Sequence, residues 1–291
     1  MTRADIAGER APGAAAGGAG SPPGGAAPRI ALAGITKRFG SVEALRGVDL
    51  ELHAGECLGL VGDNAAGKST LTKVMSGTYI PDGGTIALDG EPVSFAGPAD
   101  ARERHIEMVY QDLSLCDHVD VVGNLFLGRE LVRGPFLDRR RMLEEGRRML
   151  DALEIRIPRL GAKVAQLSGG QRQAIAIARA ASFEPRVLIM DEPTSALAVA
   201  EVEAVLGLIN RVKARGVSVI LITHRLQDLF RVCDRIAVMY EGTKVAERDV
   251  ADTDLEELVR LIVGDTSLHD GPPPEAAPGP APGAPAAERR A

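Results

Sequence analysis

The sequence predicts an α/β protein whose sheet has a parallel core, and two observations carry this prediction. Short apolar runs have the length of buried strands, and Cys57–Val61, Val187–Met190 and Val217–Ile222 are the clearest. Segments with helical apolar spacing alternate with them, for example Val199–Ala214. Strands that are buried on both faces and separated by helices are typical of parallel sheets covered by helices.

The remaining elements are expected from local patterns. Ile30–Leu52 contains short β segments around a turn at residues 39–41, and Thr85–Leu88 is a strand that precedes the turn signal Asp89-Gly90. Leu71, Val74 and Met75 have helical spacing before Gly77, which predicts a helix over Ser69–Ser76. Further expected elements are helices at Asp138–Leu153, 170–182 and Leu255–Val263, and a strand at Ile236–Tyr240.

Composition predicts how the 291 residues are divided. Ala, Gly and Pro make up 20 of residues 1–29 and 17 of residues 271–291, so both ends lack the apolar side chains of a core. We therefore expect tails at 1–29 and 265–291 and one folded domain at 30–264. Within that domain the pattern is mostly helical at about 113–166, which predicts a helical subdomain.

Several functional classes are excluded by composition. No apolar run approaches the roughly 18 residues of a membrane span, and residues 1–13 lack the apolar core of a secretory signal. Cys57, Cys116 and Cys233 form no C-x-x-C pair, so a disulfide framework or zinc site is not indicated and we expect a reducing cytoplasm. The net charge of −6 and the absence of Trp argue against a nucleic-acid partner.

The strongest motif is Gly62-Asp-Asn-Ala-Ala-Gly-Lys-Ser69, which fits G-x-x-x-x-G-K-[ST] between a predicted strand and a predicted helix. In this arrangement backbone N–H groups surround phosphate oxygens, and the positive end of the helix points at them. Lys68 can reach the β- and γ-phosphates, and Ser69 offers a hydroxyl to Mg²⁺. The motif therefore predicts nucleoside triphosphate binding.

Two acidic residues end the apolar strand Val187–Met190. Asp191 is expected at the carboxyl edge of the sheet beside the phosphate loop, where a carboxylate suits Mg²⁺. Glu192 beside it suits the polarisation of an attacking water. An acidic pair after a strand is common by itself, so this prediction depends on the phosphate loop.

A second anion site is predicted at Leu167-Ser-Gly-Gly-Gln171, which opens a helix. The two glycines leave backbone N–H groups uncovered, and Ser168 can cap the helix. In isolation this pattern is usually a plain helix cap.

In this order, the three motifs resemble those of the ATP-binding subunits of ATP-binding cassette (ABC) transporters, from about Ile30 to Gly264. Three further positions are similar to the family's pattern: Gln111 to its Q-loop glutamine, His224 to its switch histidine, and Phe39 to its adenine-stacking aromatic. The resemblance implies a P-loop NTPase fold with a parallel-core sheet, an antiparallel β subdomain and a helical subdomain. It also implies Mg²⁺-dependent ATP hydrolysis.

The resemblance assigns a role to each matching residue. Glu192 and His224 would be catalytic, and Ser168, Gly169, Gly170 and Gln171 would act in trans on the ATP of a second chain. Mg²⁺ would be held by Ser69, Gln111 and Asp191. ATP would be contacted by Phe39, Gly62, Asp63, Asn64, Ala65, Ala66, Gly67, Lys68, Ser69, Thr70 and Gln111.

Three stretches, Tyr110–Glu130, Pro193–Val202 and Thr223–Asp234, are similar to monosaccharide importers of the fructose, ribose and xylose type. This implies a peripheral ATPase subunit on the cytoplasmic face of the membrane. Its partners would be membrane-spanning permease subunits, a second nucleotide-binding subunit (a homodimer in the simplest case) and an extracytoplasmic sugar-binding protein. The alternatives are an ABC ATPase for another substrate or a soluble ABC ATPase that does not act in transport.

Two residues depart from the family's pattern. Ala65 replaces a glycine of the phosphate loop, and it would be strained if that position required positive φ. Ala198 replaces the aspartate of the D-loop, which contacts the partner cassette, and this puts the coupling of two ATP sites in doubt.

Overall fold

The computed structural model describes residues 27–270, so most of the two predicted tails lies outside the described residues. The folded domain extends beyond the predicted bounds of 30 and 264. Arg29 pairs with Asp89 at 2.6 Å, and Asp270 pairs with Arg248 at 2.6 Å. Residues 27–29 continue the Ala/Gly/Pro-rich stretch, and residues 265–270 follow the last expected helix, so both were assigned to the tails, but these ion pairs attach both segments to the domain.

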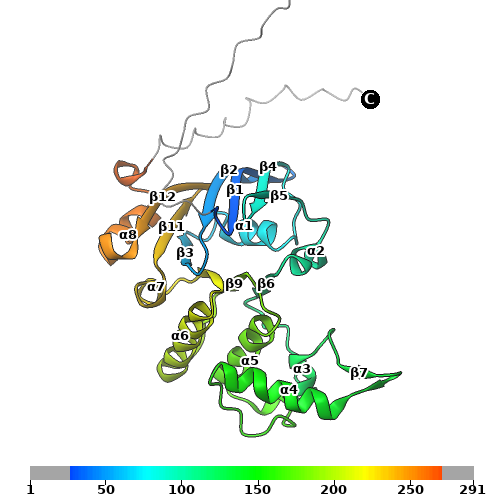
Figure 1. Ribbon diagram of the computed structural model, residues 1–291. Helices are drawn as coiled ribbons and strands as arrows, with labels where there is room; N and C mark the ends of the chain where they lie inside the picture. The colour runs from blue at the N-terminus through cyan, green and yellow to red at the C-terminus, as the bar shows by residue number, and fades with distance from the viewer. Residues whose placement is uncertain (1–26, 271–291) are drawn as a thin grey trace, which may run out of the picture.

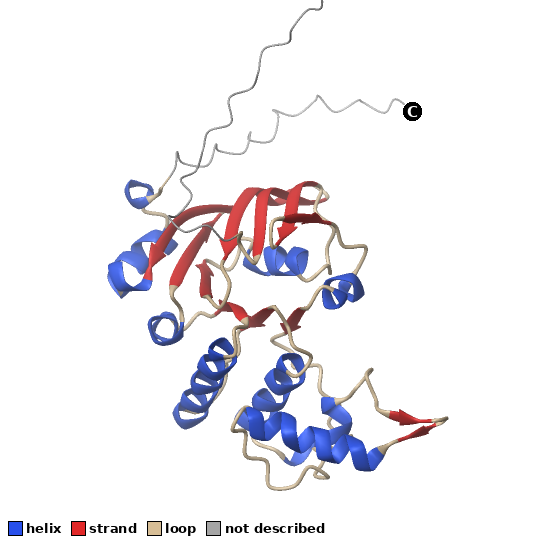
Figure 2. Cartoon of the chain, viewed as in Figure 1, coloured by secondary structure: helices blue, strands red, loops and turns tan. Residues whose placement is uncertain are grey.

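The main sheet has the strand order β12-β11-β3-β10-β9-β6 (Figures 1 and 2). Its strands are β3 (Cys57–Gly62), β6 (Ile106–Val109), β9 (Val187–Asp191), β10 (Ser218–Ile222), β11 (Arg235–Tyr240) and β12 (Thr243–Asp249). All neighbours pair in parallel except β11 and β12, which are antiparallel. The predicted parallel core is confirmed. β6 and β12 were not expected, because β6 has only four residues and β12 carries charged residues at an edge.

A second, antiparallel sheet has the order β2-β1-β4-β5, and it confirms the expected antiparallel subdomain. Its strands are β1 (Ile30–Phe39), β2 (Val42–Leu52), β4 (Gly83–Leu88) and β5 (Glu91–Val93). β1 and β2 form one long hairpin rather than several short segments. Register shifts, for example between Leu32 and Ile35, interrupt the alternation of the side chains, which explains why the pattern suggested shorter strands.

Each face of the main sheet has its own core. Along β10, Val219 and Leu221 pack with the helices on one face, whereas Ile220 and Ile222 pack toward the antiparallel sheet. Helix α1 (Lys68–Met75) lies in this second core through Leu71 and its neighbours. Apart from the helical subdomain described below, the other helices are α2 (Pro98–Glu103), α6 (Val199–Ala214), α7 (Leu226–Val232) and α8 (Leu255–Val263). Double-sided burial explains why these strands are continuously apolar.

The predicted helical subdomain lies apart from the antiparallel sheet (Figure 1). Within the predicted bounds of 113–166 it contains α3 (Val121–Leu125) and α4 (Arg139–Ala152), while α5 (Gly169–Ala181) begins beyond those bounds and packs against both. It also contains an unexpected hairpin of β7 (Val132–Arg133) and β8 (Phe136–Leu137), whose strands are too short to give a periodic pattern. No helix within residues 27–270 has the length and apolar composition needed to cross a membrane.

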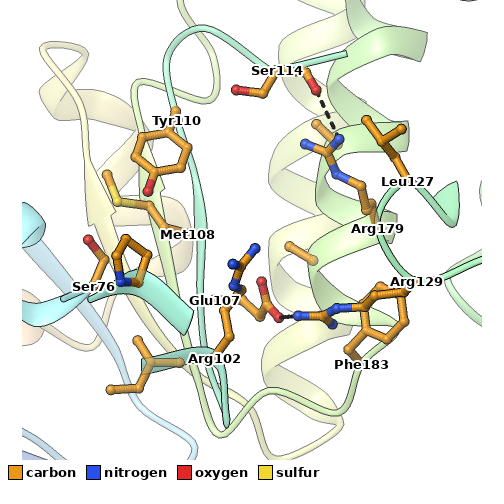
Figure 3. A pocket seen from close by; sticks show the side chains of 14 residues that line it. Ser76, Arg102, Glu107, Met108, Tyr110, Ser114, Leu127, Arg129, Arg179 and Phe183 are labelled. Atoms are coloured by element: carbon orange, nitrogen blue, oxygen red, sulfur yellow. Dashed lines mark hydrogen bonds and ion pairs between the residues drawn. The ribbon is translucent and has the colours of Figure 1, made fainter. Parts of the chain in front are cut away.

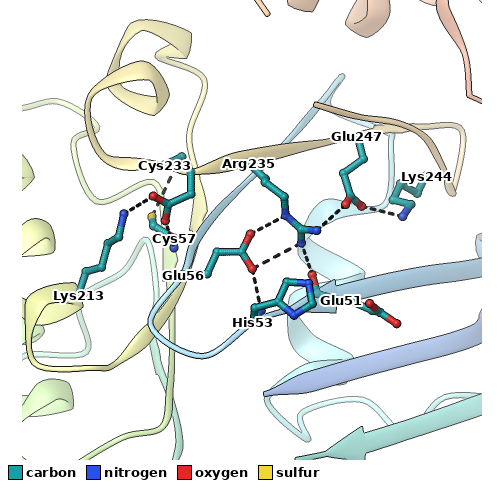
Figure 4. Close-up of polar contacts among 10 residues, drawn as sticks. Glu51, His53, Glu56, Cys57, Lys213, Cys233, Arg235, Lys244 and Glu247 are labelled. Carbon is teal, nitrogen blue, oxygen red and sulfur yellow. Dashed lines mark hydrogen bonds and ion pairs between the residues drawn. The ribbon is translucent and has the colours of Figure 1, made fainter. Parts of the chain in front are cut away.

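A polar network fixes the amino end of β3 (Figure 4). Arg235 donates to Glu56 Oε1 at 2.5 Å and to the carbonyl oxygen of Glu51 at 2.7 Å, and it pairs with Glu247 at 2.8 Å. The Glu56 side chain is buried, so a charged partner is required there. The network thereby joins strand β3 to strands β2, β11 and β12 at the end opposite to the phosphate loop.

Two of the three cysteines meet beside this network. The sulfur atoms of Cys57 and Cys233 lie 3.6 Å apart as free, buried thiols. The hydrogen bond with Cys57, and then burial, raise the pKa of the Cys233 thiol, so this thiol is protonated. Their separation of 176 residues gave no sequence signal for this contact.

The close approach at Gly62 generates a stability prediction. Gly62 has φ 146°, and a Cβ there would lie 2.2 Å from the carbonyl oxygen of Met239. Gly62→Ala should therefore destabilise the fold by about 3 kcal/mol or more, since neither backbone can move freely. The matched control is Gly55→Ala, because Gly55 has φ 71° but no atom within 4 Å of a Cβ, and it should cost about 1–2 kcal/mol. Equal losses in urea unfolding would contradict the steric explanation.

Candidate nucleotide and phosphate site

Four neighbouring strands end at the same edge of the main sheet and carry the candidate residues there. The register pairs Leu60 with Ile222, Ile222 with Asp191, and Val109 with Met190. The phosphate loop follows β3, His224 follows β10, Glu192 follows β9 and Gln111 follows β6. Parallel pairing therefore brings together residues that are separated by up to 162 positions in the sequence, from Gly62 to His224.

The phosphate loop depends on two glycines. Gly62 and Gly67 have φ of 146° and 94°, and a Cβ on Gly67 would lie 2.6 Å from the carbonyl oxygen of Ala44. Ala65 is not among the described residues with positive φ, so its substitution for glycine causes no backbone strain. The loop continues into α1, whose first residue is Lys68.

Lys68 is a buried cation surrounded by acidic groups. Its ammonium donates to the carbonyl oxygens of Gly62 and Asp63, both at 2.8 Å. Burial lowers the pKa of Lys68, whereas the nearby charges of Glu192, Asp63 and Asp191 oppose that change. An additional anion such as a phosphate would stabilise this partly desolvated charge.

Glu192 is held in an unusual backbone conformation beside His224. Its φ is 53°, and its N–H donates to the carbonyl oxygen of Ile222 at 2.9 Å. Its Oε1 lies 3.2 Å from His224 Nε2 but is buried without a hydrogen-bond partner among the described residues. Burial raises the pKa of Glu192, and His224 opposes that rise. A buried carboxylate oxygen with a free acceptor site is suited to accept a hydrogen bond from water.

Asp191, Ser69 and Gln111 offer oxygen ligands of the kind that Mg²⁺ prefers. Asp191 is partly buried, and this burial raises its pKa, whereas the nearby charges of Lys73 and Lys68 lower it. Ser69 and Gln111 are exposed. Within residues 27–270 no group of three or more His, Cys, Asp and Glu could hold a metal by itself. The set fits an ion that shares its coordination with substrate phosphates and water.

Phe39 ends β1, and the residue is 42% exposed. The ring meets Tyr79 edge-on at 5.1 Å between centroids, and its strand partner is Val42. Val42 lies two residues before Ala44, whose carbonyl oxygen would obstruct a Cβ on Gly67. This places an exposed aromatic ring on the hairpin that borders the phosphate loop.

The Leu-Ser-Gly-Gly-Gln segment caps α5 as expected. Ser168 accepts from the N–H of Gln171 at 3.3 Å, and the Gln171 side chain accepts from the N–H of Ser168 at 3.1 Å. A further contact was missed: Glu201 accepts from the N–H of Gly170 at 3.1 Å. The sequence signal for this contact was weak. Glu201 stands three residues after the first residue of a helix-capping pattern, but that first residue is Ala198, whose side chain cannot cap a helix.

Gly169 lines a cavity of about 510 Å³ with Gln111 and Glu192. Ser168, Gly170 and Gln171 line a different cavity, beside Glu201. Within one chain, therefore, the structure brings the phosphate loop, Asp191, Glu192 and His224 together but places most of the Leu-Ser-Gly-Gly-Gln segment elsewhere.

A groove of about 340 Å³ lies between the main sheet and the helical subdomain (Figure 3). Tyr110 and Ser114, on either side of Gln111, line it. Two contacts join its two sides: Arg129 pairs with Glu107 of β6 at 2.6 Å, and Arg179 of α5 donates to the carbonyl oxygen of Ser114 at 2.9 Å. The segment of Gln111 thus connects the edge of the sheet that carries the candidate residues to an open, charged groove.

Comparison with known families gives a match to the ABC transporter family over residues 45–195. The xylose/arabinose import ATP-binding protein XylG of Sulfolobus acidocaldarius is 44% identical over 228 residues, which are 78% of this chain and 91% of that protein. The ribose import ATP-binding protein RbsA 1 of Burkholderia thailandensis is 45% identical over 246 residues, 84% of this chain. The match covers 48% of that relative, so the chain spans about half its length.

Solved structures agree with the fold. The ADP conformation of an ATP-binding cassette of an ABC transporter superposes with a TM-score of 0.69 at 25% identity, over 82% of this chain and 96% of that one. The cbiO1 protein of Clostridium perfringens, part of the transporter complex cbiONQ, gives 0.69 at 26% identity, over 81% and 93%.

The burial of Glu192 generates a prediction about pH and stability. A carboxyl group whose pKa is raised by folding stabilises the fold below its ordinary value of 4.5, and that contribution is lost as the pH rises through the raised pKa. At neutral pH the fold therefore carries the cost of an ionised buried group. Glu192→Gln should raise Tm at pH 7.5 by roughly 2–4 °C, the shift expected for about 1 kcal/mol in a domain of this size.

The control for this measurement is Glu91→Gln, which removes an exposed carboxylate that has no ion pair within residues 27–270. It should leave Tm unchanged, and the gain from Glu192→Gln should shrink as the pH falls toward 4.5. A loss of stability in Glu192→Gln at pH 7.5 would contradict the predicted cost.

Proposed function

Because the chain belongs to the ABC transporter family, we propose that it is the ATP-binding and ATP-hydrolysing subunit of an importer for a monosaccharide. The observation that carries the proposal is the alignment of four parallel strand ends, which unites Lys68, Asp191, Glu192 and His224. The similarity to XylG over 91% of that protein's length supports a sugar as the transported substrate. The chain would act at the cytoplasmic face of a membrane, where ATP is available.

Phosphate binding follows from the charge of Lys68 and the backbone of the loop. In the proposed complex the ammonium would exchange the carbonyl oxygens of Gly62 and Asp63 for β- and γ-phosphate oxygens. The remaining loop residues through Thr70 would surround the phosphates, and Phe39 would stack on adenine. A magnesium ion held by Ser69, Asp191 and Gln111 would neutralise phosphate charge.

Hydrolysis would depend on Glu192 and His224. The buried Oε1 of Glu192 would accept a hydrogen bond from the attacking water and take its proton as the water oxygen bonds to the γ-phosphorus. The bond between the γ-phosphorus and the bridging oxygen would break in the same step, which releases ADP. His224, 3.2 Å from Oε1, would orient that water and contact the γ-phosphate. The N–H of His224 donates to Glu192 Oε2 at 3.4 Å, which would orient the carboxylate before substrate arrives.

A second copy of the chain would complete each site. Ser168 and Gly170 line a cavity separate from Lys68 in the single chain, which suits a contact with the nucleotide of a neighbour. In a two-fold dimer each chain would place its phosphate loop against Ser168 of the partner subunit. Removal of the bridging γ-phosphate would then let the dimer open.

The groove beyond Gln111 would receive a cytoplasmic segment of a permease subunit. Tyr110 directly precedes Gln111 and Ser114 follows it by three positions, so a contact in the groove would be coupled to the catalytic edge through this short segment. The complete system would also need an extracytoplasmic protein that captures the sugar. Export, or import of another substrate, would use the same chemistry, and the similarity to sugar-import proteins favours the sugar.

The division of labour between Lys68 and Glu192 is testable in the full chain. Lys68→Ala should abolish or severely weaken ATP binding, because it leaves phosphate charge uncompensated. Glu192→Gln should bind ATP normally but hydrolyse it about 10²–10⁴-fold more slowly, the range for loss of a general base. Equilibrium binding of a fluorescent ATP analogue and a phosphate-release assay measure both. Turnover within tenfold of wild type in Glu192→Gln would refute its assignment.

The trans role of Ser168 is testable by light scattering. With ATP and Mg²⁺, Glu192→Gln should form a stable dimer, because the bridging γ-phosphate is retained. Adding Ser168→Arg should abolish that dimer, since the new side chain would block the neighbour's phosphate, while the ATP affinity of the single chain stays within twofold. If the double variant dimerises as well as Glu192→Gln, Ser168 does not act in trans.

A further inference from the structure

Glu201 occupies the helix end to which the proposed function assigns the phosphate of the neighbouring chain. Its Oε1 accepts from the N–H of Gly170 at 3.1 Å, and its Oε2 accepts from the N–H of Ala198 at 3.2 Å. One carboxylate thus bridges the start of α5 and the start of α6. Hydrogen bonds from Gly170, Ser168 and Ala198 lower the pKa of Glu201, so the group is ionised at neutral pH.

The contact is built into the packing of this region. A Cβ on Gly170 would lie 2.8 Å from Cβ and 2.9 Å from Cγ of Glu201, so the second glycine is required for the side chain to cross the helix end. The N–H of Gln171 is already bonded to Ser168. The first turn of α5 therefore has two of its N–H groups satisfied within the chain.

We propose that Glu201 is a positioning residue that holds Gly170 in the resting chain and competes with the γ-phosphate of a second copy's ATP. The inference rests on the proposed function, in which Gly170 acts in trans. An N–H group makes one strong hydrogen bond, so the phosphate can receive the Gly170 proton only if the carboxylate releases it. The carboxylate and the phosphate are both negative, and each repels the other from this site.

The competition sets the affinity of the ATP-bound dimer. Glu201 keeps the Leu-Ser-Gly-Gly-Gln segment ordered when no nucleotide is opposite, and it weakens closure when ATP arrives. Ala198 takes part through its backbone alone, because its N–H is bonded to Glu201 and its methyl group offers no acceptor to the first turn of α6. Release of Gly170 would therefore also alter the start of α6, in the segment that follows Glu192.

The test compares Glu192→Gln with Glu192→Gln/Glu201→Gln in the full chain, using ATP, Mg²⁺ and analytical ultracentrifugation. Glutamine keeps one acceptor oxygen but removes the charge. The dimer Kd should fall by about threefold for each contact and about tenfold in total, since the two-fold dimer contains the contact twice. The ratio of the dimer Kd of Glu192→Gln to that of the double variant should shrink at 0.5 M salt, because screening weakens charge repulsion. A purely steric role would not respond to salt.

The matched control is Glu203→Gln, a charge on the same helix that pairs with Arg231 away from Gly170. It should leave the dimer Kd unchanged. In chains that retain Glu192, Glu201→Gln should also lower the KM for ATP, and melting curves check that each variant is folded.

The outcomes separate the two proposals. If Ser168→Arg abolishes the dimer but Glu201→Gln leaves it unchanged or weakens it, the role of Glu201 is refuted and the trans site stands. If Ser168→Arg has no effect or Glu192→Gln never dimerises, the trans site is refuted and the role of Glu201 is refuted with it. A tighter, salt-sensitive dimer in Glu201→Gln alone supports the competition.

Discussion

The parallel register of β3, β10, β9 and β6 is the constraint on which the candidate site depends. Because these strands are parallel and their pairing contains no register shift, their carboxyl ends meet at one edge of the sheet. Each strand then delivers one chemical function: an anion-binding loop, a histidine, two carboxylates and an amide. The apolar side chains on both faces hold the strands in place, so the register also fixes the distances within the site.

The same edge concentrates electrostatic cost. Lys68, Asp191 and Glu192 are all partly or fully withdrawn from water. Burial lowers the pKa of Lys68 and raises the pKa of Asp191 and of Glu192, so it favours the neutral form of each group. Their mutual attraction offsets part of this cost, and a triphosphate with its magnesium ion would offset more. The left-handed backbone at Glu192 is a further cost. The network around Arg235 and Glu56 secures the opposite end of β3, so the strand that carries the phosphate loop is firmly attached.

Much of the architecture could be predicted from the sequence, for physical reasons that differ between elements. The phosphate loop has a strict spacing because backbone N–H groups must converge on an anion, and the strands before it and before Asp191 are apolar because both faces are buried. β6 could not be predicted, since four residues with a charge among them carry no period. The pairing of Cys57 with Cys233 was also beyond the sequence, because only tertiary folding brings them together.

The site residues also fall into two groups, those that the sequence could predict and those that it could not. Residues whose function requires a fixed local pattern were predicted by position, whereas Glu201 was missed because its contact with Gly170 crosses between two helices. The effect of Ala65 could be decided only from its backbone angle, and the loop accepts it without strain. The assignment of roles to these residues remains a prediction that rests on geometry and on family membership.

The central claim is that each ATP site is built from two chains, and a mixing experiment tests it most directly. Lys68→Ala lacks a working phosphate loop and Ser168→Arg lacks a working trans contact, so each should be inactive alone. A mixed dimer would contain one complete site, formed by the phosphate loop of the Ser168→Arg chain and Ser168 of the Lys68→Ala chain. The account predicts that ATP hydrolysis reappears on mixing, at up to about a quarter of the wild-type rate for random pairing of chains. Activity that stays at the level of the separate variants at every mixing ratio would contradict it.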